Sequence, residues 1–114
     1  MASVDSLPEA WFVPANLTNE QRYDFLRKAV VPGGVLHRTL DAINHTELAP
    51  VSIGTYNASV SNFATTQDNI ATLLMSLKKA GSKYDHALNR LIDMNIVPMM
   101  ARIQEALDRM KKRV

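Results

Sequence analysis

The sequence predicts an all-α protein in which two short N-terminal helices precede a long heptad-repeat helix that forms a coiled coil or helical bundle. Large apolar residues recur at alternating spacings of three and four between residues 53 and 91, as on a helix with one buried stripe. The same stretch lacks the strict apolar and polar alternation of half-buried strands. Four of the five prolines precede residue 51, so only short elements fit in the N-terminal part.

Composition limits the classes of protein to which this chain can belong. Its 114 residues are 46% hydrophobic and 21% charged, which is ordinary for one globular domain. The absence of cysteine excludes disulfide frameworks, thiolate metal sites and cysteine nucleophiles. No apolar run approaches the ~18 residues of a membrane span, and residues 1–10 lack the basic and apolar regions of a signal peptide. We therefore expect a cytoplasmic protein without a transmembrane segment.

The pattern divides the chain into three parts. Residues 1–17 are predicted to form an extended N-terminal anchor or tail, residues 18–50 two short helices, and residues 51–114 a coiled-coil oligomerisation helix. In the first part, Trp11 and Phe12 lie between two prolines and cannot join a long helix. They form a candidate anchor that either packs back on the helices or inserts into a groove of a partner protein.

Two short helices are predicted in the second part. Thr18 and Gln21 have the capping-box spacing and are followed by apolar residues three and four apart, so the first helix is expected from about residue 19 to residue 31. A Pro-Gly-Gly turn at 32–34 separates it from a second helix, expected over about 34–44. This turn lacks the lysine and the spaced glycines of a phosphate-binding loop.

The third part carries the strongest pattern. With Ile53 at position a, ten of the twelve a and d residues up to Leu91 are large and apolar. The e and g positions are mostly small or apolar instead of Glu and Lys, which is typical of helices that bury a wide face among several neighbours. We therefore predict association of three or more copies, or of related helical subunits, with polar Gln67 fixing the register. The predicted interface residues are Ile53, Tyr56, Val60, Phe63, Gln67, Ile70, Leu74, Leu77, Tyr84, Leu88 and Leu91.

A hairpin competes with a continuous helix. Glycine is unfavourable inside a helix and Ser82 resembles an N-cap, so the chain can fold back at Gly81 into arms of about 52–80 and 83–112. The heptad phase passes through Gly81 without a slip, which favours the continuous helix.

A second interruption lies further along. Beyond Leu91 the apolar row moves by one position, so we expect the helix to kink, or to stop and restart, near Pro98. A terminal helix is then expected over about 98–112, with a cationic last turn. That turn supplies the candidate anion-binding residues, which are Arg109, Lys111, Lys112 and Arg113.

No pattern of catalytic or metal-binding residues stands out. His37, His45 and His86 have no partner at a metal-ligand spacing, so they are expected to be solvated side chains. The carboxylates are scattered, and the heptad core holds no Glu or His from which a carboxylate metal site could be built. We expect no catalytic residue, no metal and no cofactor.

The function predicted from these observations is assembly. The strong features are all interface features, so we expect a non-enzymatic structural or scaffolding protein that oligomerises or joins a multi-subunit complex. The alternative is an oligomeric protein that binds nucleic acid or an anionic membrane through the basic end of its last helix.

Overall fold

The computed structural model describes residues 13–46, 50–79 and 82–114, and these residues are mostly helical. The prediction of an all-α fold is confirmed, since no strand occurs within the described ranges. Trp11 and Phe12 lie outside them. The elements are α2 (Asn19–Ala29), α3 (Val35–Thr46), α4 (Ile53–Lys79), the 3-10 helix η1 (Ser82–Tyr84), α5 (Asp85–Leu91), the π-helix η2 (Ile92–Ile96) and α6 (Val97–Lys111).

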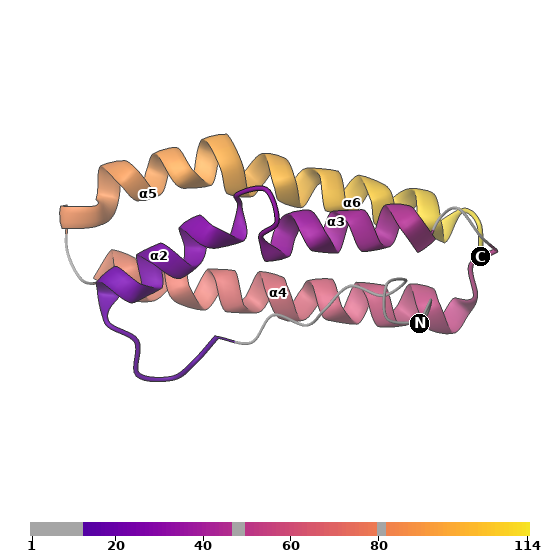
Figure 1. Cartoon of the computed structure of the whole chain (residues 1–114), viewed down its shortest axis with the longest axis horizontal. Helices are drawn as coiled ribbons and strands as arrows, with labels where there is room; N and C mark the ends of the chain where they lie inside the picture. Colours follow the sequence, from indigo (N-terminus) through magenta and orange to yellow (C-terminus); the bar gives the residue numbers. More distant parts are fainter. Residues whose placement is uncertain (1–12, 47–49, 80–81) are drawn as a thin grey trace.

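Three rods of helix lie side by side (Figure 1). The first rod is α2 followed by α3, the second is α4, and the third is α5, η2 and α6 in continuous succession. Each rod runs opposite to the one before it, with α2 packed mainly on α4 and α3 packed mainly on α6. The molecule measures 47 × 25 × 21 Å, so its long axis is about the length of α4.

The expected continuous helix over 51–114 is wrong, and the hairpin is the observed path. Helix α4 ends at Lys79, and α5 and α6 return alongside it (Figure 1). The observed arms, 53–79 and 82–111, match the hairpin alternative within a residue or so, and the reversal itself lies outside the described residues. Folding back allows one chain to bury its own apolar stripe against itself, which a single long helix cannot do.

The capping box predicted at the start of α2 is present. The backbone N–H of Gln21 donates to Thr18 Oγ1 at 3.2 Å, and the Gln21 side chain accepts from the Thr18 N–H at 2.9 Å. Helix α2 ends at Ala29, two residues before the predicted end, because the chain has to turn at Pro32.

The turn between α2 and α3 requires both of its glycines. Gly33 has a φ of +83°, and the Gly34 N–H donates to the Val31 carbonyl at 2.9 Å, as in a type II turn with proline before the glycine. A Cβ on Gly34 would lie 2.2 Å from the Lys28 carbonyl oxygen. The turn therefore allows a close approach of α3 to the end of α2 that no other residue type permits.

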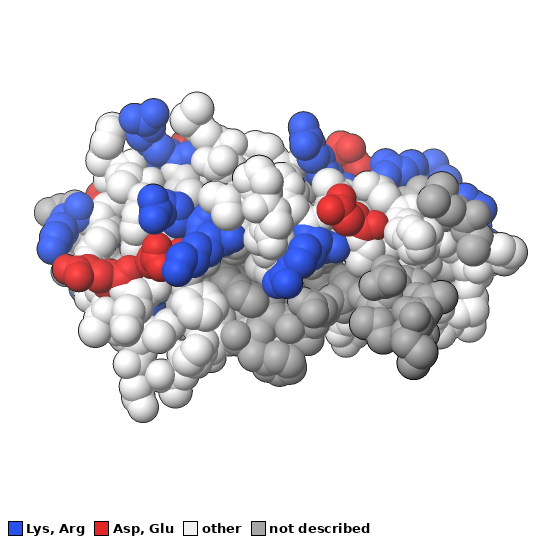
Figure 2. All heavy atoms as spheres, in the orientation of Figure 1, with Lys and Arg blue, Asp and Glu red and all other residues white. Residues whose placement is uncertain are grey.

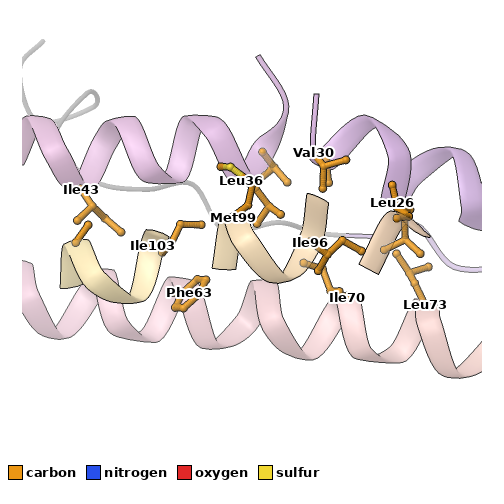
Figure 3. Packing of buried hydrophobic residues seen from close by; sticks show 14 of the residues in the cluster. Leu26, Val30, Leu36, Ile43, Phe63, Ile70, Leu73, Ile96, Met99 and Ile103 are labelled. Atoms are coloured by element: carbon orange, nitrogen blue, oxygen red, sulfur yellow. The ribbon is translucent and has the colours of Figure 1, made fainter. Parts of the chain in front are cut away.

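The three rods share one apolar core (Figure 3). Ile43 of α3 and Phe63 of α4 lie near Ile103 of α6. Further along the core, Ile70 of α4 lies beside Ile96 of η2, and Leu26 of α2 lies beside Leu73 of α4. The buried residues of α4 follow a heptad spacing, but they occupy the d and g positions of the predicted register instead of a and d. They are Ser59, Phe63, Thr66, Ile70, Leu73 and Leu77.

Two of these buried residues are polar. For that reason the apolar pattern of the sequence did not indicate that the g positions are buried. Ser59 Oγ donates to the Thr55 carbonyl at 2.9 Å, and Thr66 Oγ1 donates to the Asn62 carbonyl at 3.1 Å. Each hydroxyl is thus satisfied within its own helix turn. Burial of these two side chains leaves no unpaired hydroxyl, and their small size lets the neighbouring rod pack closely.

The predicted interruption near Pro98 is a π-helical turn in an otherwise continuous rod. The Val97 N–H donates to the Ile92 carbonyl, five residues back, and Pro98 lies in the first turn of α6. Leu91 and Ile96 are both buried although they are five positions apart in the sequence. The additional residue of the π turn explains the one-position shift of the apolar row, because it keeps the stripes of α5 and α6 on the same side.

Candidate assembly surface

Five of the predicted interface residues are buried inside the single chain. Phe63, Ile70 and Leu77 of α4 belong to its core, as do Leu88 and Leu91 of α5. Their prediction as contacts between chains is therefore corrected: the hairpin uses them to join its own two arms. Tyr56, Leu74 and Tyr84 are partly buried and pack against the same core.

The remaining three lie on the open side of α4. Ile53 is 62% exposed and Val60 is 38% exposed, and Gln67 is also exposed. Gln67 therefore cannot fix the register of a buried row within the chain. All three residues occupy predicted a positions. In the structure these positions lie at the edge of the core and not inside it.

A strip with few charges runs along this side of α4, and we call it the α4 outer face. It combines the exposed residues of the predicted a, e and b positions. They are Ile53, Gly54, Asn57, Val60, Ser61, Ala64, Gln67, Asp68, Ala71, Met75 and Lys78. Asp68 is the one charged residue of the sequence between 53 and 77, so about 37 Å of helix carries almost no charge on a solvent-facing surface.

Large apolar side chains on this face remain uncovered. Met75 is 60% exposed and Val60 is 38% exposed, so both ends of the strip's middle part carry apolar surface in contact with solvent. Ala64 and Ala71 are exposed near the middle of the same strip. Small apolar side chains therefore lie on both sides of Gln67 and Asp68, which occupy the centre of the strip.

Two pairs of residues on the α4 outer face are placed symmetrically about a point between Gln67 and Asp68. Ala64 and Ala71 lie at equal distances from this point along the helix. Val60 and Met75 form a second such pair, and each pair consists of residues of similar chemistry. A two-fold axis through this point would place each member of a pair opposite the other on a second helix, which is the condition for an interface between identical subunits.

The start of α4 is capped locally. Ser52 Oγ accepts from the Thr55 N–H at 3.1 Å and donates to Thr55 Oγ1 at 2.9 Å. With this cap and the d and g residues buried, α4 is held as one straight helix over its whole length (Figure 1). The outer face is thus presented on a rigid element.

The basic end of α6 is partly used within the chain. Arg109 Nη2 donates to Asn44 Oδ1 of α3 at 3.1 Å, whereas Lys111, Lys112 and Arg113 are exposed. Lys and Arg side chains accordingly lie along the end of the molecule where α6 finishes (Figure 2). Three remaining cations neutralise few phosphates, so this end alone is a weak anion-binding surface.

The histidines do not form a site. His37 is half-buried, and its Nε2 lies 3.0 Å from the Val30 carbonyl, so the expectation of a solvated side chain is wrong for this residue. His45 and His86 are exposed. Within the described ranges, no three His, Asp or Glu residues are grouped as metal ligands, and no helix has the length and apolar content of a membrane span.

Comparisons with protein-family models, with curated proteins and with solved structures each find no match to this chain.

Proposed function

We propose that this chain is a non-enzymatic assembly protein that pairs with a second copy of itself through the α4 outer face, with the two α4 helices antiparallel. The observation that carries the proposal is the symmetric, nearly uncharged pattern of exposed residues about the point between Gln67 and Asp68. A closed pair of identical subunits needs a patch that is complementary to itself. Two copies, not three or more, follow from a single such patch on one helix.

The chemistry of the strip fits this pairing. Ala64 would lie opposite Ala71 of the second copy, and such small side chains allow two helix axes to approach to about 8 Å. Val60 would lie opposite Met75, so that exposed apolar surface is buried on both sides of the alanines. At the centre, the Gln67 amide can donate to the Asp68 carboxylate of the other copy, and the two-fold axis makes this contact twice.

The size of the α4 outer face determines the expected affinity of the dimer. About ten residues on each side is fewer than the 20–30 that a standard interface uses. We therefore expect a dimer that forms with a dissociation constant on the order of micromolar or weaker.

The test is particle mass as a function of concentration, measured by sedimentation equilibrium on the full chain. The mass should rise from 12.7 kDa toward twice that value as concentration increases. Ala71→Glu should hold the protein at the mass of one chain, because it places an unpaired charge against Ala64 of the other copy. The double variant Ala64→Lys with Ala71→Glu should restore the dimer, since each new lysine then faces a new glutamate.

A matched control separates this geometry from general charge effects. Thr72→Glu adds the same charge at an exposed position beside the strip and should leave the mass unchanged. In a parallel pair, residue 64 would face residue 64, so the double variant would repel and remain a single chain. That result, or a constant mass of one chain for the unmodified protein, would contradict the proposal.

A further inference from the structure

A groove separates α2 from the first half of the third rod. It has a volume of about 550 Å³ and lies between Tyr23 and Arg27 of α2 on one side and residues of α5 and η2 on the other. The α5 and η2 residues that line it are His86, Ala87, Arg90, Leu91, Met94 and Asn95. The volume lies within the range of sites that bind small ligands or peptide side chains.

The rim of this groove is cationic. Arg27 and Arg90 stand on opposite walls, with exposed His86 beside Arg90, and no carboxylate is among the described residues that line the groove. Asp24 of α2 lies 2.8 Å from Lys28 Nζ and 3.3 Å from Arg27 Nη2, so Arg27 already has one carboxylate partner within the chain. Several Lys and Arg side chains lie over this end of the molecule (Figure 2).

The floor of the groove is apolar and adaptable. Leu91 is buried there, and the ring of Tyr23 stacks on Tyr84 at a centroid distance of 5.8 Å. Met94 is 66% exposed. Because a methionine side chain is flexible and apolar, Met94 is well suited to cover a bound apolar side chain. Met94 and Asn95 belong to the π-helical turn, and such turns occur often at functional sites.

We infer that this groove binds an acidic peptide segment of a partner protein, one that also carries a large apolar side chain. The guanidinium of Arg90 matches a carboxylate through paired hydrogen bonds, and the N–H groups of Arg27 that Asp24 does not use can donate to a second carboxylate. The apolar side chain of the partner is covered by Met94 and Leu91. Among the described residues, the groove lining holds only two guanidiniums, which favours a peptide over a nucleic acid, whose binding needs many phosphate contacts. This inference is independent of dimerisation through α4, because the groove contains no residue of the α4 outer face.

The test uses fluorescence anisotropy with the full chain and a labelled synthetic peptide of about twelve residues built from Glu and Leu with one Trp. The protein should bind this peptide and should bind the same peptide with Gln in place of Glu about tenfold more weakly or worse. Arg90→Ala and Met94→Ala should each weaken binding of the acidic peptide, the first by about tenfold. Both side chains are exposed, so these variants keep the fold.

The matched control is Arg102→Ala, which removes the same charge from an exposed position of α6 outside the groove and should leave the affinity unchanged. Equal weakening by Arg90→Ala and Arg102→Ala would mean unspecific attraction of charge and would overturn the inference. Absence of peptide binding would overturn it as well. Tighter binding of a single-stranded oligonucleotide of similar length, lost in Arg90→Ala, would assign the groove to nucleic acid instead.

Discussion

Tyr23 of α2 stacks on Tyr84 of η1, with ring centroids 5.8 Å apart and ring planes inclined by 29°. Lys83 adds to this contact, since its Nζ lies 5.6 Å from the centre of the Tyr84 ring and 3.9 Å from a carboxylate oxygen of Glu20. The stack joins the first rod to the start of the third rod at the end of the molecule where the chain reverses direction (Figure 1). It therefore fixes the start of the third rod on α2, although the two tyrosines are far apart in the sequence.

Replacing Tyr84 with alanine should loosen this end of the molecule. The variant loses the ring stack and part of the apolar burial, so we expect the free energy of unfolding to fall by about 1–3 kcal/mol. Chemical denaturation monitored by circular dichroism measures this change. Tyr84→Phe keeps the ring and should remain within about 0.5 kcal/mol of the unmodified protein. Equal stability of the alanine and phenylalanine variants would show that the stack contributes nothing.

A methyl group at Gly34 should be far more damaging than one at Gly54. The added Cβ of Gly34→Ala would lie 2.2 Å from the Lys28 carbonyl oxygen and 2.8 Å from that of Ala29, and both are backbone atoms that can yield only if α2 and α3 separate. We expect a loss of about 3 kcal/mol or more. At Gly54 the nearest atom is Ser52 Oγ at 3.9 Å, so Gly54→Ala should stabilise α4 by up to about 1 kcal/mol. Thermal unfolding of the two variants compares them directly.

Much of this fold could be predicted from local chemistry. The capping box of Thr18 and Gln21 and the turn at Gly33 depend on residues close in sequence, and both were predictable for that reason. The direction of the chain after Lys79 could not be predicted, because the heptad spacing is the same whether a helix packs on another chain or on its own returning arm. The structure resolves this ambiguity through long-range contacts between α4 and α6 that no local pattern encodes.

The register of the candidate surface was harder to predict than its existence. Ser59 and Thr66 are polar, so the pattern assigned them to a flank, although both are fully buried with hydroxyls bonded to their own helix. Only the small or apolar character of the e and g residues indicated a wide buried face. The lack of charge between residues 53 and 67 was visible in the sequence, but which part of it faces solvent depends on the position of the third rod.

Thr39 should be a site at which an apolar replacement stabilises the protein. Its side chain is 1% exposed, and its Oγ1 has no hydrogen-bond partner within the described part of the chain. Thr39→Val keeps the branched shape and removes the unpaired hydroxyl, so we expect a gain of about 1 kcal/mol. Thr66→Val is the matched control, since that buried hydroxyl does donate to Asn62, and its loss should leave stability unchanged or lower it by up to about 1 kcal/mol. A loss of stability in Thr39→Val would contradict the conclusion that the Thr39 hydroxyl is unpaired and costs stability.

Asp24 should titrate below the ordinary range for aspartate. Hydrogen bonds from Lys28 and then Arg27, opposed in part by desolvation, hold the pKa of its carboxyl below the usual 3.8. Because the folded-state pKa is the lower one, the ion pair stabilises the fold above about pH 4 and this contribution disappears as the pH falls through the lowered pKa. An NMR titration of the carboxyl measures the effect. Lys28→Ala should move the pKa upward, and an unchanged value would rule out Lys28 as its main cause.

Deleting Asn95 should convert the π turn into an ordinary α-helix without loss of the fold. Removal of this exposed residue brings Leu91 and Ile96 from five residues apart to four, which keeps both on the buried side of a regular helix. We expect an unfolding temperature equal to or above that of the full sequence. Deletion of Glu105, also exposed but inside α6, rotates the following residues by about 100° and removes Leu107 from the core, so that variant should be strongly destabilised.

The Asn95 deletion also distinguishes two roles of the π turn, which are the stability of the third rod and the proposed binding of an acidic peptide in the groove. Without the additional residue, the turn no longer projects Met94 over the space between α2 and α5, so the Asn95 deletion should weaken binding of the acidic peptide even where its unfolding temperature rises. A shortened protein that binds the peptide as tightly as before would show that the π turn keeps the apolar stripes in register and has no part in recognition.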